Sequence, residues 1–201
     1  MKSYMRDQFD YLGIKSPIRR EALKVFLSEH GLPDERQLHP ITRALWKLPF
    51  REFKYNALDM LARFKRLDLK LLPMLEWMTV TESWWDTVDH ISDNLIGRKI
   101  LIHHPDLMRP KAEEWIASDN LWLQRTAIIF QMQFRERLDE KLLFDMILRR
   151  IDETDFFIRK AIGWALREHA KLHPERVKAF VSKHGKMLSG LSKREALKHF
   201  K

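Results

Sequence analysis

A short sequence unit recurs six times along this chain, and its spacing constrains the fold more than any other feature. The fourth position of the unit is Ala or Val in every copy, and the fifth is Leu or Ile in all but one. Successive copies are 31 to 39 residues apart, a period typical of repeats that each contain a pair of helices. The copies are Arg19–Leu23, Lys54–Leu58, Trp85–Asp89, Gln124–Ile128, Ile158–Ile162 and Lys193–Leu197.

Shorter amphipathic stretches lie between the copies, at about residues 37–47, 68–79, 106–117, 138–151 and 175–184. Only six Gly and eight Pro occur among 201 residues, which is few for a turn-rich β protein. We therefore predict an all-α chain whose helical hairpins stack into a curved superhelix, with one set of helices lining a concave surface. No long linker interrupts the array, so we expect a single domain over residues 1–201.

The composition limits the chemistry that the chain can perform. With 37 Lys and Arg against 28 Asp and Glu, the net charge is +9, which favours a polyanionic partner and a basic concave cleft. No Cys is present, which excludes disulfides and thiolate nucleophiles and agrees with a reducing compartment. No apolar stretch approaches the roughly 20 residues that span a bilayer. We expect a soluble cytoplasmic protein without a membrane partner.

The third copy of the unit breaks the pattern, because Asp89 occupies its fifth position. Two interpretations of this carboxylate are open: a structural partner of one of the many Arg residues, or a functional anion. Arg125 is at the second position of the next copy, so a concave wall can present Asp89 among cations that favour its charged form. Ser83 and Asp86 have the spacing of a capping box, which predicts that Ser83 is the N-cap of this helix.

Other polar and aromatic positions also follow the repeat. Trp164 has Lys160 four residues before it and Arg167 three residues after it, so these side chains share one helix face. Such an indole is either a core residue or part of a surface that grips sugars, bases or phosphates. Cations recur at the first two positions of the unit and predict a stripe matched to a phosphate backbone, unless they pair with acids of adjoining repeats: Arg20, Lys54, Arg125, Arg159, Lys193 and Arg194.

We expect neither a metal site nor a bound cofactor. His169 and His173 have helical spacing, but the Glu of a zinc-protease motif is absent between them. The sequence contains no phosphate-binding Gly loop, no dinucleotide fingerprint and no nucleophile elbow. The remaining Trp residues without flanking cations are expected in the core, namely Trp46, Trp77, Trp115 and Trp122.

Blocks of sequence along almost the whole chain resemble the AlkD-like DNA alkylation-repair glycosylases, which are built from HEAT-like repeats. The blocks occur in the family's order and are Tyr4–Met5, Phe9–Pro17, Arg51–Phe53, Ser83–Asp89, Trp115–Arg125, Ile162–Glu168 and Leu191–Ala196. The resemblance implies a HEAT-like superhelix that removes N3- and N7-alkylated purines, such as 3-methyladenine and 7-methylguanine, from double-stranded DNA.

The resemblance also implies roles for individual residues. Asp89 is similar to the family's catalytic carboxylate, Trp85 and Trp164 to its cleft aromatics, Arg125 to its backbone-binding arginine, and Tyr4 to its N-terminal tyrosine. An alkylated purine is already cationic and leaves as a neutral base, so a single carboxylate can suffice to stabilise the oxocarbenium-like sugar.

We expect a monomer that binds DNA through Tyr4, Arg125 and basic residues of the last two repeats. These basic residues are Lys160, Arg167, Lys193 and Arg194. Two alternatives remain open at this stage: a non-catalytic DNA-structure binder on the same superhelix, and a protein-interaction scaffold, which is a common use of helical repeats.

Overall fold

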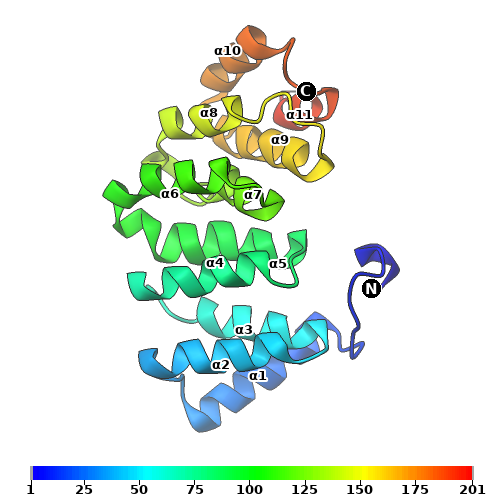
Figure 1. The fold of residues 1–201 in the computed structure, drawn as a ribbon, viewed down its shortest axis with the longest axis vertical. Helices are drawn as coiled ribbons and strands as arrows, with labels where there is room; N and C mark the ends of the chain where they lie inside the picture. Colours follow the sequence, from blue (N-terminus) through cyan, green and yellow to red (C-terminus); the bar gives the residue numbers. More distant parts are fainter. Residues whose placement is uncertain (1, 201) are drawn as a thin grey trace. The chain divides into compact units, whose positions relative to one another are not determined.

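In a computed structural model, which describes residues 2–200, the regular elements are helices, and the only strand-like pairing is an isolated bridge between Asp10 and Phe50 (Figure 1). The prediction of an all-α fold is therefore confirmed. The α-helices are α1 (Ser16–His30), α2 (Glu35–Lys47), α3 (Arg51–Ala62), α4 (Leu72–Val80), α5 (Trp85–Asp89), α6 (Pro105–Ala117), α7 (Leu121–Ile129), α8 (Glu140–Leu148), α9 (Phe156–Ala170), α10 (Pro174–His184) and α11 (Gly190–Ala196). Shorter elements are the 3₁₀ turns η1 (Ser3–Met5), η2 (Leu69–Leu71), η4 (Leu101–His103) and η5 (Arg135–Arg137), and the π-helical segment η3 (His90–Gly97).

The repeat unit falls on every second helix, as its period predicts. Its six copies lie in α1, α3, α5, α7, α9 and α11; the third copy ends with its helix at Asp89, and the sixth passes the end of α11 by one residue. The amphipathic stretches between them correspond to α2, α4, α6, α8 and α10. Each repeat is therefore a pair of helices, and the helical-repeat class of the fold is confirmed.

Side-chain caps explain where several of these helices begin. Asp34, Asn120, Asp139, Asp155 and Ser189 each precede a helix and accept hydrogen bonds from backbone N–H groups of its first turn. These N–H groups have no partner within the helix, so the caps stabilise the starts of α2, α7, α8, α9 and α11.

The described helices form two compact units, Met1–Met78 and Thr79–Lys201, with α4 running across the boundary. Each unit is described by itself, and the prediction of a single domain stays a prediction. The basic cleft predicted along the whole array also stays a prediction. No helix within residues 2–200 is long and apolar enough to cross a membrane.

In the second unit the helices form two adjoining rows. Helices α5, α7, α9 and α11 contact one another in succession, while α6 packs against both α7 and α8 (Figure 1). The small residue of the repeat unit lies at the contacts of the first row: Val88, Ala127, Ala161 and Ala196 are each at most 1% exposed. Close packing of helices at these positions follows from their small side chains.

The aromatic core matches the sequence prediction in part. Trp46 and Trp115 are each 1% exposed, as expected. Trp77 and Trp122 are only half-buried. Trp77 of α4 has the guanidinium of Arg43 4.3 Å from its ring centroid, a cation from α2 that the local sequence around Trp77 did not indicate.

The third repeat departs from regular helix geometry immediately after Asp89. Helix α5 continues into the π-helical η3, whose widened turns are marked by the bond from the Arg98 N–H to the Asp93 carbonyl, five residues earlier. At the end of η3, Gly97 lies against α7 so closely that an added Cβ would be 1.9 Å from the Phe130 carbonyl oxygen. The π-helical segment is thus fixed in place by a contact that only glycine allows.

The start of α5 also differs from the sequence prediction. Trp84 is the N-cap, with extended backbone and no side-chain cap bond, and the Ser83 hydroxyl instead donates to the Thr79 carbonyl at 2.6 Å. The capping-box prediction for Ser83 is therefore wrong, because the chain turns through a left-handed Glu82 (φ 48°) and Ser83 bonds back to α4.

We expect Gly97→Ala to lower the free energy of unfolding by about 1–3 kcal/mol, because the added methyl group must displace the backbone of α7. Gly190→Ala is the matched control, since its Cβ would meet nothing closer than the Arg194 Nη1 atom at 3.5 Å. Urea denaturation followed by circular dichroism measures both variants. Equal denaturation midpoints for the two variants would contradict the proposed close contact at Gly97.

Candidate functional site

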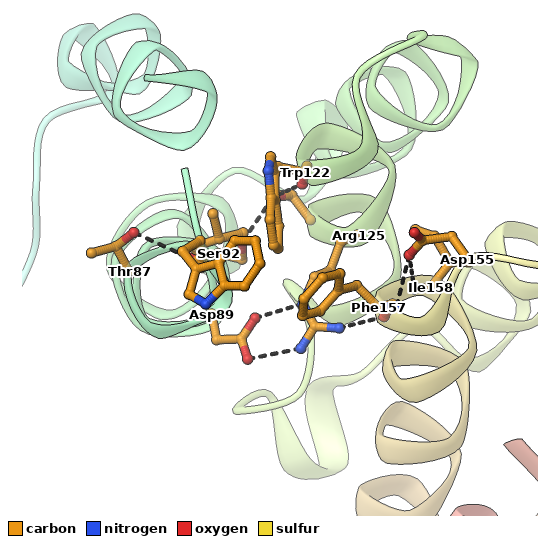
Figure 2. A network of polar contacts seen from close by, with 11 residues as sticks. Thr87, Asp89, Ser92, Trp122, Arg125, Asp155, Phe157 and Ile158 are labelled. Carbon is orange, nitrogen blue, oxygen red and sulfur yellow. Dashed lines mark hydrogen bonds and ion pairs between the residues drawn. The ribbon is translucent and has the colours of Figure 1, made fainter. Parts of the chain in front are cut away.

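Asp89, the residue that breaks the repeat, is paired with the arginine of the next repeat. Arg125 donates from Nε to Oδ1 of Asp89 at 2.7 Å and from Nη2 to Oδ2 at 2.8 Å (Figure 2). Asp89 is the last residue of α5, and Arg125 lies in the middle of α7, a helix that contacts α5. This bidentate geometry fixes both the position and the orientation of the carboxylate.

Arg125 is itself held by the neighbouring repeat. Its third bond runs from Nη1 to the carbonyl oxygen of Phe157 at the start of α9, and the side chain is only 3% exposed. The rings of Trp84, Trp122 and Phe157 form a cluster in this region, with centroids 5.0 to 5.8 Å apart. One guanidinium therefore connects three consecutive repeats at the site (Figure 2).

The surroundings of Asp89 act on its charge in opposite directions. Burial raises the pKa of Asp89 above the ordinary value of 3.8, whereas the hydrogen bonds and positive charge of Arg125 favour the ionised form. Neutralising Asp89 would leave the charge of Arg125 buried without a counterion, which is strongly unfavourable. We therefore treat Asp89 at neutral pH as a carboxylate held in a fixed orientation.

Asp89 remains 16% exposed and borders an open pocket of about 340 Å³. The carboxylate is thus neither sealed in the apolar core nor free in solvent. The same pocket is lined by Trp164 of α9, so the structure brings together two of the residues predicted from the sequence. The full lining is Asp89, His90, Asp93, Asn94, Arg98, Gln133 and Trp164.

Asp93 is a second carboxyl group in this pocket, and the sequence analysis missed it. It lies four residues after Asp89 in η3 and is 9% exposed. Its burial, together with the charge of Asp89, raises its pKa to about 6, against the opposing hydrogen bond from Gln133. The four-residue step that placed Trp85 beside Asp89 would also have placed Asp93 there.

The cations beside Trp164 form a network with a carboxylate of the last repeat. Lys160 Nζ lies 2.7 Å from Oε1 of Glu195, and Arg167 forms an ion pair with Oε2 of the same residue. Lys160 is 39% exposed and Arg167 18% exposed, so both retain solvent contact on the helix that carries Trp164. Glu195 therefore orients two of the cations that we predicted to bind DNA.

The remaining predicted site residues take different places. Trp85 is the half-buried first residue of α5, one turn before Asp89 on the same helix face. Lys193 is half-buried and donates to the Gly185 carbonyl at 3.0 Å, whereas Arg194 is exposed. Tyr4 is 72% exposed and belongs to the other compact unit, so its predicted place in the cleft stays a prediction.

The predicted cationic stripe is wrong as a continuous exposed row. Lys54 is 1% exposed and donates to the Leu48 carbonyl, while Arg125 is occupied by Asp89 and Phe157. Arg159, half-buried, bonds to the Glu153 carbonyl through Nε at 2.9 Å. The open alternative, in which repeat cations pair with acids of adjoining repeats, applies to Arg125 with Asp89 and to Arg20, whose Nε lies 3.4 Å from Oδ2 of Asp59.

His169, one of the two helically spaced histidines, contacts a carboxylate. Its Nε2 lies 2.8 Å from Oε2 of Glu140, and its ring lies 5.0 Å from that of His173. Glu140 also accepts from Arg176 of α10, which holds the pKa of Glu140 below its usual value. This cluster joins α9 to α8 and α10, which lie outside the row that contains α5, and none of its residues lines the pocket at Asp89.

Comparison with known proteins identifies the class of this chain. Residues 1–200 match the family described as DNA alkylation repair enzyme, and the chain belongs to that family. A predicted DNA alkylation repair enzyme from Enterococcus faecalis has the same fold, with a TM-score of 0.87 and 29% identity over 99% of this chain and 92% of that one. The family relationship confirms the resemblance seen in the sequence blocks.

Two more distant structures share the fold. AlkD2 from Streptococcus mutans has a TM-score of 0.68 at 18% identity, covering 98% of this chain and 97% of that chain. The protein smu.31 from Streptococcus mutans UA159 has a TM-score of 0.65 at 16% identity, covering 89% of each chain. No curated protein matches the sequence at a significant level.

We expect Arg125→Ala to lower the free energy of unfolding by about 3 kcal/mol at neutral pH, because it leaves the Asp89 carboxylate without its counterion. In the folded variant the pKa of Asp89 is then raised further. The folded variant therefore binds a proton at Asp89 more tightly than the unfolded chain does. The loss of stability is therefore largest above that raised pKa and shrinks as the pH falls toward the ordinary value of 3.8.

Urea denaturation at about pH 7.5 and about pH 5 measures this difference. The control is Arg176→Ala, which removes an exposed cation from Glu140 and should change the midpoint little at either pH. A loss of stability by Arg125→Ala that is the same at both pH values would show that Asp89 is not the group left uncompensated.

Proposed function

We propose that this DNA alkylation repair enzyme is a monofunctional glycosylase that hydrolyses the N-glycosidic bond of cationic N3- and N7-alkylated purines in double-stranded DNA. We expect it to act as a cytoplasmic monomer without a cofactor. The observation that carries the proposal is the carboxylate of Asp89, oriented by Arg125 through two hydrogen bonds while still bordering an open pocket.

Cleavage of this bond develops positive charge on the deoxyribose as the base departs. A fixed carboxylate beside the sugar stabilises that charge, and no reorganisation of the site is needed because Arg125 already holds Asp89 in place. The same carboxylate can orient a water molecule toward C1′ of the sugar. The alkylated base carries its own positive charge, so it leaves as a neutral molecule without a proton donor.

The two tryptophans supply a further contribution to the transition state. Trp164 borders the pocket with Asp89, and Trp85 lies one helix turn before Asp89. The face of each ring attracts a cation, which contributes about 0.5–2 kcal/mol per ring. This amount is too small to replace the carboxylate, so we assign Asp89 the main catalytic role and Arg125 the role of positioning it.

DNA binding is assigned to the basic residues around α9 and α11. Lys160 and Arg167 flank Trp164, and Lys193 and Arg194 follow on α11. Contacts with phosphates hold the duplex without reading its sequence, which suits an enzyme that acts on lesions in any sequence. The family resemblance implies two more contacts, and we include both in the proposal. Tyr4 contacts the DNA, and Arg125 contacts the DNA backbone directly.

We expect Asp89→Asn to lower the rate of 7-methylguanine release by about 100-fold or more, because the neutral amide no longer stabilises the cationic sugar. Affinity for the same DNA should change little. The measurement is single-turnover base release from methylated duplex, together with binding by fluorescence anisotropy.

Asp119→Asn makes the same chemical change at an exposed position between α6 and α7 and is the matched control. Circular dichroism verifies that both variants are folded. Undiminished release by Asp89→Asn would remove Asp89 from the mechanism. Tight binding by wild-type protein without any release of 7-methylguanine or 3-methyladenine would favour the non-catalytic DNA binder, and weak binding even at low salt would favour the protein scaffold.

We expect Arg194→Ala to weaken DNA binding and to reduce the slope of log affinity against log salt concentration by about one unit, since one phosphate contact is lost. The control is Lys178→Ala on α10, an exposed cation paired with Glu175 in the other row of helices. Salt titrations of duplex binding measure both slopes. The assignment of Arg194 fails if the two variants have the same slope.

A further inference from the structure

The pocket at the proposed catalytic site contains two carboxyl groups, and the function proposed above uses only one of them. Asp89 and Asp93 lie four residues apart along α5 and η3, and both line the same open pocket. Asp93 comes from the π-helical segment, a rare geometry that occurs frequently at functional sites. The second carboxyl group therefore calls for a chemical role of its own.

The two groups have contrasting partners. Both oxygens of Asp89 accept short bonds from a buried guanidinium, which favours the charged form. Asp93 accepts one long side-chain bond, from Gln133 Nε2 to Oδ2 at 3.4 Å, and no ion pair joins it to a cation within residues 2–200. These partners favour the ionised form of Asp89, whereas the protonated form of Asp93 is accessible.

Burial is the main reason that the pKa of Asp93 rises to about 6, and the nearby charge of Asp89 adds to it. The hydrogen bond from Gln133, the backbone at Asn94 and the charge of Arg98 oppose the rise. Besides Asp89 and Arg98, the titratable residue that lines the pocket with Asp93 is His90, whose ring nitrogen Nε2 lies 3.1 Å from the Asn94 side-chain amide. Helix α9 faces the pocket with the neutral Trp164, and His103 of η4 does not line it.

Two carboxyl groups of unequal acidity beside one glycosidic bond are the arrangement used by enzymes that must also protonate the leaving group. A cationic alkylpurine needs no such proton. A purine lesion without fixed charge does need one, because it would otherwise leave as an anion. The second carboxyl group therefore makes sense chemically if the site also accepts uncharged bases.

We propose that Asp93 is a general acid of this site and that it extends base excision to uncharged purine lesions, of which hypoxanthine is the probe. This inference rests on the proposed glycosylase function. The carboxylic proton of Asp93 passes to a ring nitrogen of the purine as the C1′–N9 bond breaks, and the bonding electron pair leaves with the neutral base. Water adds to C1′ and gives its proton to the Asp89 carboxylate, and exchange with solvent returns both groups to their starting forms.

The experiment measures single-turnover release of hypoxanthine and of 7-methylguanine from matched duplexes, each with one lesion, by the full chain. For wild-type protein, release of hypoxanthine should be about tenfold faster at about pH 5 than at about pH 7, after subtraction of the protein-free rate, since the protonated fraction of Asp93 changes by that factor. Asp93→Asn should lower the ratio of hypoxanthine to 7-methylguanine release by about 100-fold.

Gln133→Ala provides a second variant with little risk to folding, because Gln133 is exposed. Its side chain donates to Asp93 and lowers the pKa of that group, so its removal should move the hypoxanthine profile to higher pH. A merely structural role of Asp93 would not produce this shift. Asp119→Asn again serves as the control for the change from carboxylate to amide.

The outcomes separate this inference from the proposed function. Release of 7-methylguanine without any hypoxanthine release overturns the role of Asp93 and leaves the proposed function intact. Hypoxanthine release with an unchanged ratio in Asp93→Asn, or with an unmoved profile in Gln133→Ala, also overturns it. Release of neither base overturns the proposed function together with the inference.

Discussion

The ion pair between Asp89 and Arg125 is the interaction on which the site depends. A carboxylate at a position that other repeats fill with Leu or Ile would be costly, and the guanidinium of the next repeat offsets that cost with two short hydrogen bonds. Because Arg125 also bonds to Phe157, the charge at Asp89 is supported by three repeats at once. Helical repeats can thus place a carboxylate in a packed row of helices.

The architecture could be predicted from the sequence because one pattern governs it. The recurrence of a small residue every 31 to 39 positions located every second helix from α1 to α11, and the departure at Asp89 indicated the candidate site. Both inferences use a period, which is visible along the chain itself. The family resemblance agreed with them independently and is supported by the match over residues 1–200.

The contacts that individual side chains make could not be predicted from the repeat pattern. The repeat predicted where the cations lie but did not decide whether Lys54 and Arg125 face solvent or contact groups within the protein, because a period does not identify the partner of a side chain. The π-helical geometry of η3 was equally hidden, and so was the close approach of Gly97 to Phe130, the residue that follows α7, because the two are distant in sequence. Asp93 was missed for the opposite reason: the local signal was present, but nothing in the sequence indicates burial.

The wide turns of η3 also have a consequence for how this pocket can change through insertions and deletions. Each residue of a π-helix advances by less than the roughly 100° of an α-helix, so η3 accommodates an additional residue within nearly the same total rotation. Loss of one residue between Asp89 and Gly97 would therefore let an ordinary helix form while both ends keep nearly their present directions. The side chains between the two ends, including Asp93, are the ones whose directions would change.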